Sequence, residues 1–410
     1  MMGGRNRGWG LLLATAVLTG VLAAPVGAAG AAEASALGVS AARTATMTDL
    51  GTLPGGTYSS ASAINARGQV TGTANSTAGG ASHAFRWTAS GGMQDLGTLG
   101  GTYSFPSAIN ERGQVTGIGD TAGGATHAFR WTASGGMQDL GTLGGTYSSA
   151  SAINTRGQVA GGADTAPGAR HAFRWTASGG MQDLGTLGGS SCSEATGINA
   201  LGQVTGNAFG LDAACGPMDS PRHAFRWTAS GGMQDLGTLN GTWSSASAIN
   251  ERGQVTGYAG AADGGGHAFR WTASGGMQDL GTLGGSYSFP AGINARGQVA
   301  GSATSPAGGT SHAFRWTASG GMQDLGTLGG TYSGASAINE WGQVAGGADT
   351  AGGTVLINHA FRWTASGGMQ DLGTLGGDYG SSASAINARG QVAGYSSTPD
   401  GTTHAFLWTP

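Results

Sequence analysis

The residues best suited to chemistry are the eight histidines, each of which opens a nearly identical segment. The first segment runs from His83 to Leu99, begins His-Ala-Phe-Arg-Trp and ends Asp-Leu-Gly-Thr-Leu. Imidazole is a common metal ligand, so eight of them in equivalent positions raise the question of a metal centre. Spacings of 44, 44, 52, 44, 45, 47 and 45 residues separate His83, His127, His171, His223, His267, His312, His359 and His404.

This spacing argues against a metal centre. A fixed period of about 45 residues indicates a repeat architecture with one histidine in each unit. On a ring of such units, neighbouring histidines would lie on the order of 13 Å apart, given about 4.8 Å between strands. Metal ligands must come within about 2 Å of one ion. We therefore expect no metal and no cofactor, and a hydrogen bond from each histidine to a backbone group.

Nucleophilic or acid–base catalysis is not indicated either. Every Ser-Gly-Gly belongs to a turn, whereas a nucleophilic serine of the common hydrolase type sits on a strand-to-helix elbow. A pair of catalytic carboxylates would need acids that depart from the repeat. Asp212 and Asp219 do so in a long insertion, but they stand alone. We expect a protein that is not an enzyme; the alternative is an extracellular polysaccharide hydrolase or lyase.

Arginine recurs at one turn position in six of the eight repeats. On a closed ring these residues would form a cationic circle around one mouth of the channel, which is one way to bind an anion. The simpler interpretation is solvated turn residues, partly neutralised by Glu111, Glu251 and Glu340. The six are Arg67, Arg112, Arg156, Arg252, Arg296 and Arg389.

The local sequence predicts four short strands in each unit. In the first unit these are residues 60–65, 69–73, 83–88 and 93–96, with turns at Asn65–Gly68 and Ala89–Gly92. Glycine is too dense for a helix, and no segment after residue 40 has a helical period. A four-stranded unit of about 45 residues is typical of a propeller blade. The small residues of the first strand suit the crowded axis, and the aromatic third strand suits the outside.

The ends of the chain predict how the ring closes. Residues 44–53 match a fourth strand with nothing before it, and residues 384–409 supply only the first three strands of an eighth unit. Pairing the two ends completes that unit and leaves no open sheet edge. We predict an all-β, eight-bladed propeller that spans residues 46–410 as one domain.

A four-residue turn at Ala89–Gly92 would set the register of the third and fourth strands. Thr88 would then face Met93, and Arg86 would face Asp95. The last repeat has Leu407 in place of the arginine, so we expect Asp49 to lack this partner and the closing blade to be the softest.

Composition and the N-terminal sequence indicate export. Residues 1–36 have two arginines, an apolar stretch and small residues suited to signal-peptide cleavage, and residues 37–45 form a short leader segment. The chain has 18 Lys and Arg, all of them Arg, against 21 acids, which disfavours nucleic acid as a partner. We expect a secreted monomer without membrane insertion. Cys192 and Cys215, the only cysteines, should form a disulfide in an oxidising compartment.

The repeats resemble those of the HAF-repeat extracellular proteins, a family named after the triplet His-Ala-Phe. The matching motifs are Asp-Leu-Gly-Thr-Leu-Gly-Gly, Ala-Ile-Asn-x-x-Gly-Gln-Val and His-Ala-Phe-x-Trp, and they cover residues 46–409. The resemblance implies an exported bacterial repeat protein, propeller-like, with no enzymatic activity attached. The fourth repeat departs from the pattern at Cys192 and Leu201 and the seventh at Trp341, and both carry insertions.

Variation between the repeats points to a function in binding. The loop between the second and third strands ranges from 9 residues in the second repeat to 16 in the fourth, while the turns keep their length. Variable loops on a rigid scaffold are common binding sites, although loops also vary where nothing depends on them. We expect a binding or scaffold module for an extracellular protein or glycan, with a structural surface protein as a further alternative. The candidate residues are Phe209, Leu211, Asp212, Met218, Asp219, Arg222, Val355, Leu356, Ile357 and Asn358.

Overall fold

The computed structural model describes residues 45–410, except residues 77–79, 167, 189, 211–214, 216–221, 307–309 and 352–356. Residues Thr44–Pro410 form a compact unit of their own. The expected signal peptide, residues 1–36, lies outside the described residues, as do residues 37–44 of the expected leader. Among the described residues, none belongs to a helix of the length and apolarity that crossing a membrane requires.

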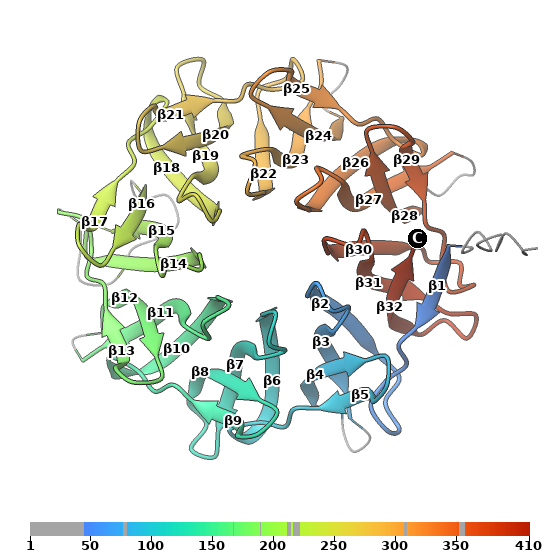
Figure 1. The fold of residues 1–410 in the computed structure, drawn as a ribbon, viewed down its shortest axis with the longest axis horizontal. Coiled ribbons are helices and arrows are strands. Elements are labelled where there is room, and N and C mark those ends of the chain that lie inside the picture. The colour runs from blue at the N-terminus through green and yellow to red at the C-terminus, as the bar shows by residue number, and fades with distance from the viewer. Residues whose placement is uncertain are drawn as a thin grey trace, which may run out of the picture. The chain divides into compact units, whose positions relative to one another are not determined.

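Thirty-two strands form eight antiparallel sheets of four strands each, arranged as blades around a ring (Figure 1). This all-β propeller confirms the fold predicted from the repeats. Blades 1 to 4 comprise β2 (Ser59–Ile64), β3 (Val70–Asn75), β4 (Ser82–Thr88), β5 (Gly92–Asp95); β6 (Gly100–Ile109), β7 (Val115–Thr121), β8 (Thr126–Thr132), β9 (Gly136–Asp139); β10 (Gly144–Ile153), β11 (Val159–Thr165), β12 (Arg170–Thr176), β13 (Gly180–Asp183); β14 (Cys192–Ile198), β15 (Val204–Phe209), β16 (Arg222–Thr228) and β17 (Gly232–Asp235).

Blades 5 to 8 continue the same order, and the last blade takes its fourth strand from the start of the chain. They comprise β18 (Asn240–Ile249), β19 (Val255–Ala261), β20 (Gly266–Thr272), β21 (Gly276–Asp279); β22 (Ser288–Ile293), β23 (Val299–Thr304), β24 (Ser311–Thr317), β25 (Gly321–Asp324); β26 (Gly329–Ile338), β27 (Val344–Thr350), β28 (Asn358–Thr364), β29 (Gly368–Asp371); β30 (Ser381–Ile386), β31 (Val392–Ser397), β32 (Thr403–Thr409) and β1 (Thr46–Asp49).

The first strand of each blade lies nearest the middle of the ring and the fourth lies outermost (Figure 1). Because neighbouring strands are antiparallel, the connections divide between two ends of the blades. The turns between first and second strands, and between third and fourth strands, emerge at one end, which we call the turn face. The loops between second and third strands, and the links from blade to blade, emerge at the other end, which we call the loop face.

The predicted register of the third and fourth strands is wrong by one residue. Thr88 pairs with Gly92, so the loop has three residues and not four, and Arg86 consequently pairs with Gln94. Gly92 has φ of +65°, the left-handed conformation that ends a three-residue hairpin loop with a bulge. A shift of one residue moves side chains to the opposite face of the sheet. Asp95 therefore does not face Arg86, whose Nη2 donates to Gln94 Oε1 over 3.2 Å.

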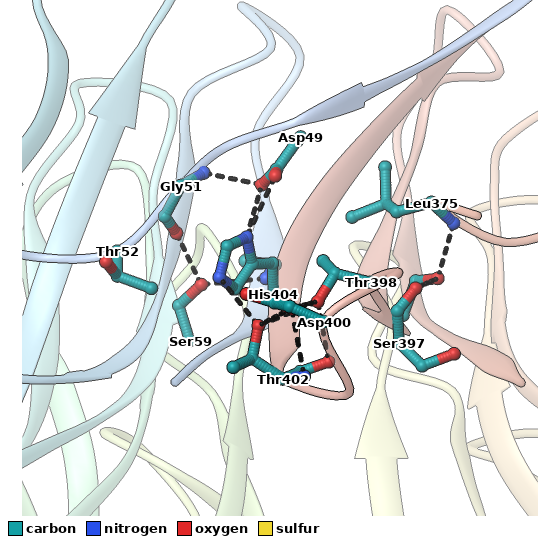
Figure 2. A network of polar contacts seen from close by, with 12 residues as sticks. Asp49, Gly51, Thr52, Ser59, Leu375, Ser397, Thr398, Asp400, Thr402 and His404 are labelled. Carbon is teal, nitrogen blue, oxygen red and sulfur yellow. Dashed lines mark hydrogen bonds and ion pairs between the residues drawn. The ribbon is translucent and has the colours of Figure 1, made fainter. Parts of the chain in front are cut away.

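The closing blade confirms the predicted pairing of the two chain ends. β1 pairs with β32, from Thr46 opposite Thr409 to Asp49 opposite Phe406. The presence of Leu407 led us to expect that Asp49 would lack a partner, and this expectation is wrong. His404 Nδ1 lies 2.8 Å from Asp49 Oδ2 (Figure 2). Leu407 instead packs into an apolar cluster with residues of blade 1. The seam thus replaces an arginine contact with apolar packing.

Each junction between blades is filled from the third strands. The phenylalanine of every His-Ala-Phe triplet is fully buried. At seven junctions an arginine guanidinium lies 4.6–5.6 Å from the centre of the tryptophan ring of the next blade, a cation–π contact. The pairs are Arg86–Trp131, Arg130–Trp175, Arg174–Trp227, Arg226–Trp271, Arg270–Trp316, Arg315–Trp363 and Arg362–Trp408.

A closed circle of asparagine hydrogen bonds joins the first strands on the turn face. In each blade the Nδ2 of one buried asparagine donates to the backbone oxygen of the equivalent asparagine in the next blade, over 2.8–3.0 Å. The circle includes the seam, where Asn387 donates to Asn65. Its members are Asn65, Asn110, Asn154, Asn199, Asn250, Asn294, Asn339 and Asn387.

A second circle of hydrogen bonds lies nearer the loop face. The N–H of the alanine in each His-Ala-Phe triplet donates, over 2.8–2.9 Å, to the hydroxyl of a buried serine in the first strand of the next blade. At the seam Ala405 donates to Ser59. The same serine donates to a backbone oxygen of the link that precedes it, as Ser104 does to Gly97. The link is thereby fixed against both blades.

The asparagine circle generates a stability prediction. Asn199 uses its whole amide: Nδ2 donates to Gln203 Oε1 and to the oxygen of Asn250, and Oδ1 accepts from the N–H groups of Leu201 and Gln203. Replacing Asn199 by Ala leaves buried partners unsatisfied, so the free energy of unfolding should fall by about 1–3 kcal/mol or more. Urea unfolding measures this. The exposed Arg252→Ala in the equivalent turn is the control, and equal effects of the two changes would contradict the role of the circle.

Cys192 and Cys215 form the predicted disulfide, with 5.5 Å between their Cα atoms. The bridge links the start of β14 to the loop between β15 and β16, both on the loop face of blade 4. In the chain-entropy account, closing a loop of about 24 residues stabilises the folded state by roughly 3 kcal/mol. The Cys192→Ser/Cys215→Ser variant should therefore melt at a lower temperature than the unreduced protein. Two titratable thiols in the native protein would contradict the bridge.

Candidate binding surface on the loop face

Each histidine contacts a carboxylate of its own blade. We had expected a hydrogen bond to a backbone group, and this expectation is wrong. The Nδ1 lies 2.7–2.9 Å from an Asp Oδ2 on the fourth strand, as between His83 and Asp95. The register explains this, because the shift of one residue turns Asp95 away from Arg86 and towards His83. The described part of the chain contains no group of three or more His, Cys, Asp or Glu side chains placed to hold a metal ion. The histidines hold the outer strands together.

The arginines of the turn face are exposed, as the simpler interpretation expected. Their neighbouring glutamates do not pair with them in the described residues. Glu111 and Glu340 instead accept the N–H of Ala66 and Ala295 from the preceding blade. Trp341 takes the arginine position in blade 7, where it is 62 % exposed and lies 5.3 Å from the guanidinium of Arg296.

The predicted candidate residues fall partly outside what the structure describes. Leu211, Asp212, Met218, Asp219, Val355 and Leu356 lie among the omitted residues. Phe209 ends β15, where it pairs with Cys192 on one side and Arg222 on the other. Ile357 and Asn358 are half-buried at the start of β28. The described candidates thus lie at the base of the two variable loops.

The repeats differ most, within their strands, at positions that surround the middle of the ring on the loop face. We call these positions the inner rim. Each blade contributes three residues to it: the two that flank the buried serine of the first strand, and the second-strand residue that pairs with the one following the serine. In blade 2 they are Tyr103, Phe105 and Ile118. In blade 4 they are Cys192, Glu194 and Asn207. The buried serine between them recurs in every blade.

The inner rim gathers most of the exposed large apolar side chains. Among the described residues nine such side chains are exposed, and two of them, Leu201 and Trp341, belong to the turn face. The other seven, exposed by 39–83 %, belong to the rim or, for Tyr379, directly precede it: Tyr58, Phe105, Tyr287, Phe289, Tyr332, Tyr379 and Tyr395. Exposed large apolar side chains that gather in one region mark interaction sites. Sequence reasoning missed these residues, although the recurrent tyrosine of the links was a signal.

The rim changes its chemistry from one junction to the next. Between blades 3 and 4 it is charged: Arg170 Nη2 donates to Glu194 Oε1 over 2.9 Å and to Ser149 Oγ over 2.6 Å. The Arg170 guanidinium also lies 4.7 Å from the ring of Tyr147. The N–H of Arg170 donates to Cys215 Sγ, so the disulfide anchors this cluster.

Between blades 5 and 6 the rim is aromatic. Trp243 and Tyr258 meet edge to face with 5.2 Å between ring centres, and Tyr258 meets Phe289 of the next blade at 5.5 Å. Tyr287 stacks beside Phe289 at 6.3 Å. Such arrangements are the favourable geometries for aromatic pairs, so the rings form an ordered surface.

Comparison with known proteins gives the fold and no family. Neither a family model nor a curated protein matches the sequence. The chain is similar to dipeptidyl peptidase 4 of Porphyromonas gingivalis, with a TM-score of 0.55 and 10 % identity over 88 % of this chain and 58 % of that one. The propeller domain of the Trilobed protease from Pyrococcus furiosus has a TM-score of 0.47, 10 % identity and coverage of 78 % and 99 %. The BP39L lectin of Burkholderia pseudomallei has a TM-score of 0.45 and 10 % identity over 77 % of this chain and 98 % of that one.

The similarity to dipeptidyl peptidase 4 corrects the expectation that the chain is not an enzyme. A propeller of this fold is part of the dipeptidyl peptidase 4 chain, so the fold is compatible with enzymes and absence of catalysis does not follow from it. The similarity at 10 % identity extends to the fold alone. The chain thus has a β-propeller fold that is similar to part of a peptidase chain.

Proposed function

We propose that the chain is an extracellular propeller that binds a macromolecular partner, a protein or a glycan, on the inner rim of its loop face. The observation that carries the proposal is the gathering of exposed aromatic side chains on this rim, next to serines that are buried in every blade. Tyrosine and tryptophan supply large contact areas at low entropic cost and are enriched at the centres of interfaces.

The setting of the rim supports a preorganised site. The rim residues flank a serine whose hydroxyl is hydrogen-bonded to the preceding blade and to the link between the two blades, so their backbone is held before a partner arrives. Preorganisation of this kind reduces the entropic cost of binding. The disulfide is typical of an oxidising compartment, which agrees with the export predicted from residues 1–36 and with the resemblance to HAF-repeat proteins. We propose that the protein acts as a secreted monomer.

Substitutions taken from other repeats test which face binds. The loop-face variant Phe105→Ser/Phe289→Ser/Tyr395→Thr uses residues found at equivalent positions of blade 1, so the fold should persist. The turn-face variant Leu201→Arg/Trp341→Arg uses the arginine of the other repeats. Ligands selected from a glycan array and a peptide-display library with the native protein should lose about tenfold or more in affinity for the first variant and little for the second. A lack of any selected ligand, or loss confined to the turn-face variant, would reject the proposal.

Exchange of the longest variable loop tests the contribution of blade 4. Residues 207–222 are replaced by residues 118–126 of blade 2, together with Cys192→Tyr, since tyrosine precedes the buried serine in blade 2. The melting temperature should fall by no more than loss of the disulfide causes, because blade 2 carries the short loop without harm. Affinity for the selected ligands should decrease, as predicted for Phe209, Leu211, Asp212, Met218, Asp219 and Arg222. Unchanged affinity would place the contacts on other blades.

A further inference from the structure

The junction between blades 5 and 6 contains a cavity on the inner rim. Its volume is about 410 Å³, which lies within the range of about 300–1,000 Å³ found for small-ligand sites. Trp243 and Tyr287 supply its aromatic walls. The remainder is backbone-rich, with no charged side chain in the lining: Gly241, Thr242, Gly260, Ala261, Gly264, Gly265 and Gly266.

At the cavity, blade 5 departs from other blades because Gly260 stands where three of them have an aspartate. A Cβ at Gly260 would lie only 3.0 Å from Trp243 Nε1, so the indole ring covers this glycine. In blade 2 the residue equivalent to Gly260 is Asp120, whose carboxylate lies against Gly101, the equivalent of Gly241. Asp120 Oδ2 accepts from the N–H of Thr102 and Oδ1 accepts from that of Tyr103, each over 2.6 Å. Blades 3 and 7 have Asp164 and Asp349 at this position.

Hydrogen bonding shows that an acceptor is favoured at this place. Partial burial raises the pKa of Asp120, but the bonds from the N–H groups of Thr102 and Tyr103 outweigh it and hold the pKa below its ordinary value. In blade 5 the corresponding N–H groups belong to Thr242 and Trp243, and Gly260 supplies no side-chain oxygen to them. Both residues line the cavity. The backbone carbonyl of Gly260 lies against Gly241, as the carboxylate of Asp120 lies against Gly101 in blade 2, so the backbone fills this place and the Trp243 ring lines the cavity.

The electrostatics of the cavity select a neutral ligand. No cation lies in the lining to balance an anion. Asp263, at the edge, already holds His267 at 3.2 Å and accepts the N–H of Gly265, and its negative charge would repel an anionic ligand. A charged ligand would also lose hydration without a partner.

We propose that this cavity is a carbohydrate subsite that seats one neutral pyranose unit of a glycan, an inference that rests on the proposed function. The pyranose offers a face of C–H bonds to the rings of Trp243 and Tyr287, and its hydroxyl groups hydrogen-bond to the glycine-rich backbone that forms the rest of the lining. Neighbouring units of the glycan lie along the rim against Tyr258 and Phe289.

Titration calorimetry with four neutral tetrasaccharides, cellotetraose, chitotetraose, mannotetraose and galactotetraose, tests the proposal. At least one should bind the native protein with one site per chain, and tetragalacturonate, which has the same ring and carboxylates, should bind more weakly. Binding should quench tryptophan fluorescence, since Trp243 lines the site. No binding by any of the four at millimolar concentration, or tighter binding of tetragalacturonate, would overturn the proposal.

The variant Trp243→Tyr/Gly260→Asp rebuilds blade 5 after blade 2 and provides the decisive control. The variant removes the indole that lines the cavity and adds a carboxylate beside it, so affinity for the bound tetrasaccharide should fall about tenfold or more while the melting temperature is kept. Should the double variant not fold, Trp243→Tyr alone should still weaken binding. Trp341→Arg on the turn face should bind as the native protein does.

Unchanged affinity of the folded blade 5 variants would refute the subsite. This outcome differs from failure of the proposed function, because ligands selected by array and display would still respond to the Phe105→Ser/Phe289→Ser/Tyr395→Thr variant.

Discussion

The hydrogen bond from each buried asparagine to the next blade is the interaction on which the rest of the structure depends. One side chain terminates the first strand, shapes the following turn through its Oδ1, and ties the blade to its neighbour through its Nδ2. The bond repeats around the ring and passes through the seam, so no blade can tilt without breaking two of them. A buried amide whose four hydrogen-bonding positions are all used tolerates little displacement. The motif Ala-Ile-Asn-x-x-Gly-Gln-Val is thus a device for joining blades.

Rigidity at the turn face and at the buried serines leaves the inner rim free to vary. Side chains such as Phe105 and Glu194 project from strands whose backbone is already fixed, so their exchange alters the surface and not the fold. The propeller can therefore present a charged junction around Arg170 and an aromatic junction around Trp243 on nearly identical blades. Function in such a molecule is encoded by departures from the repeat, and the repeat itself encodes only the scaffold.

The period of the repeats and the unpaired fourth strand at the N-terminus were sufficient to predict the blades, their number and the closure of the ring. The register was not predictable, because Ala-Ser-Gly-Gly suits a turn of three or four residues, and only the left-handed Gly92 decides between them. That single residue also decides that His83 meets Asp95. The rim was missed because its residues were assigned to links or to small-residue strands. Gly260 was a readable signal, since acids stand at its place in three other repeats.

The seam has a consequence for how the ring selects its own closing partner. β1 has the sequence Thr-Met-Thr-Asp, and every other fourth strand has Gly-Met-Gln-Asp, so β1 resembles the strands that already cover β4, β8 and their equivalents. Those strands are tethered by three-residue loops, at an effective concentration that a distant segment cannot match. β32 pairs instead with β1, from a distant part of the sequence, and Leu407 opposite Thr48 replaces the usual arginine–glutamine pair there. At this seam, pairing between distant segments and the packing of Leu407 therefore do what a three-residue loop does in the other blades.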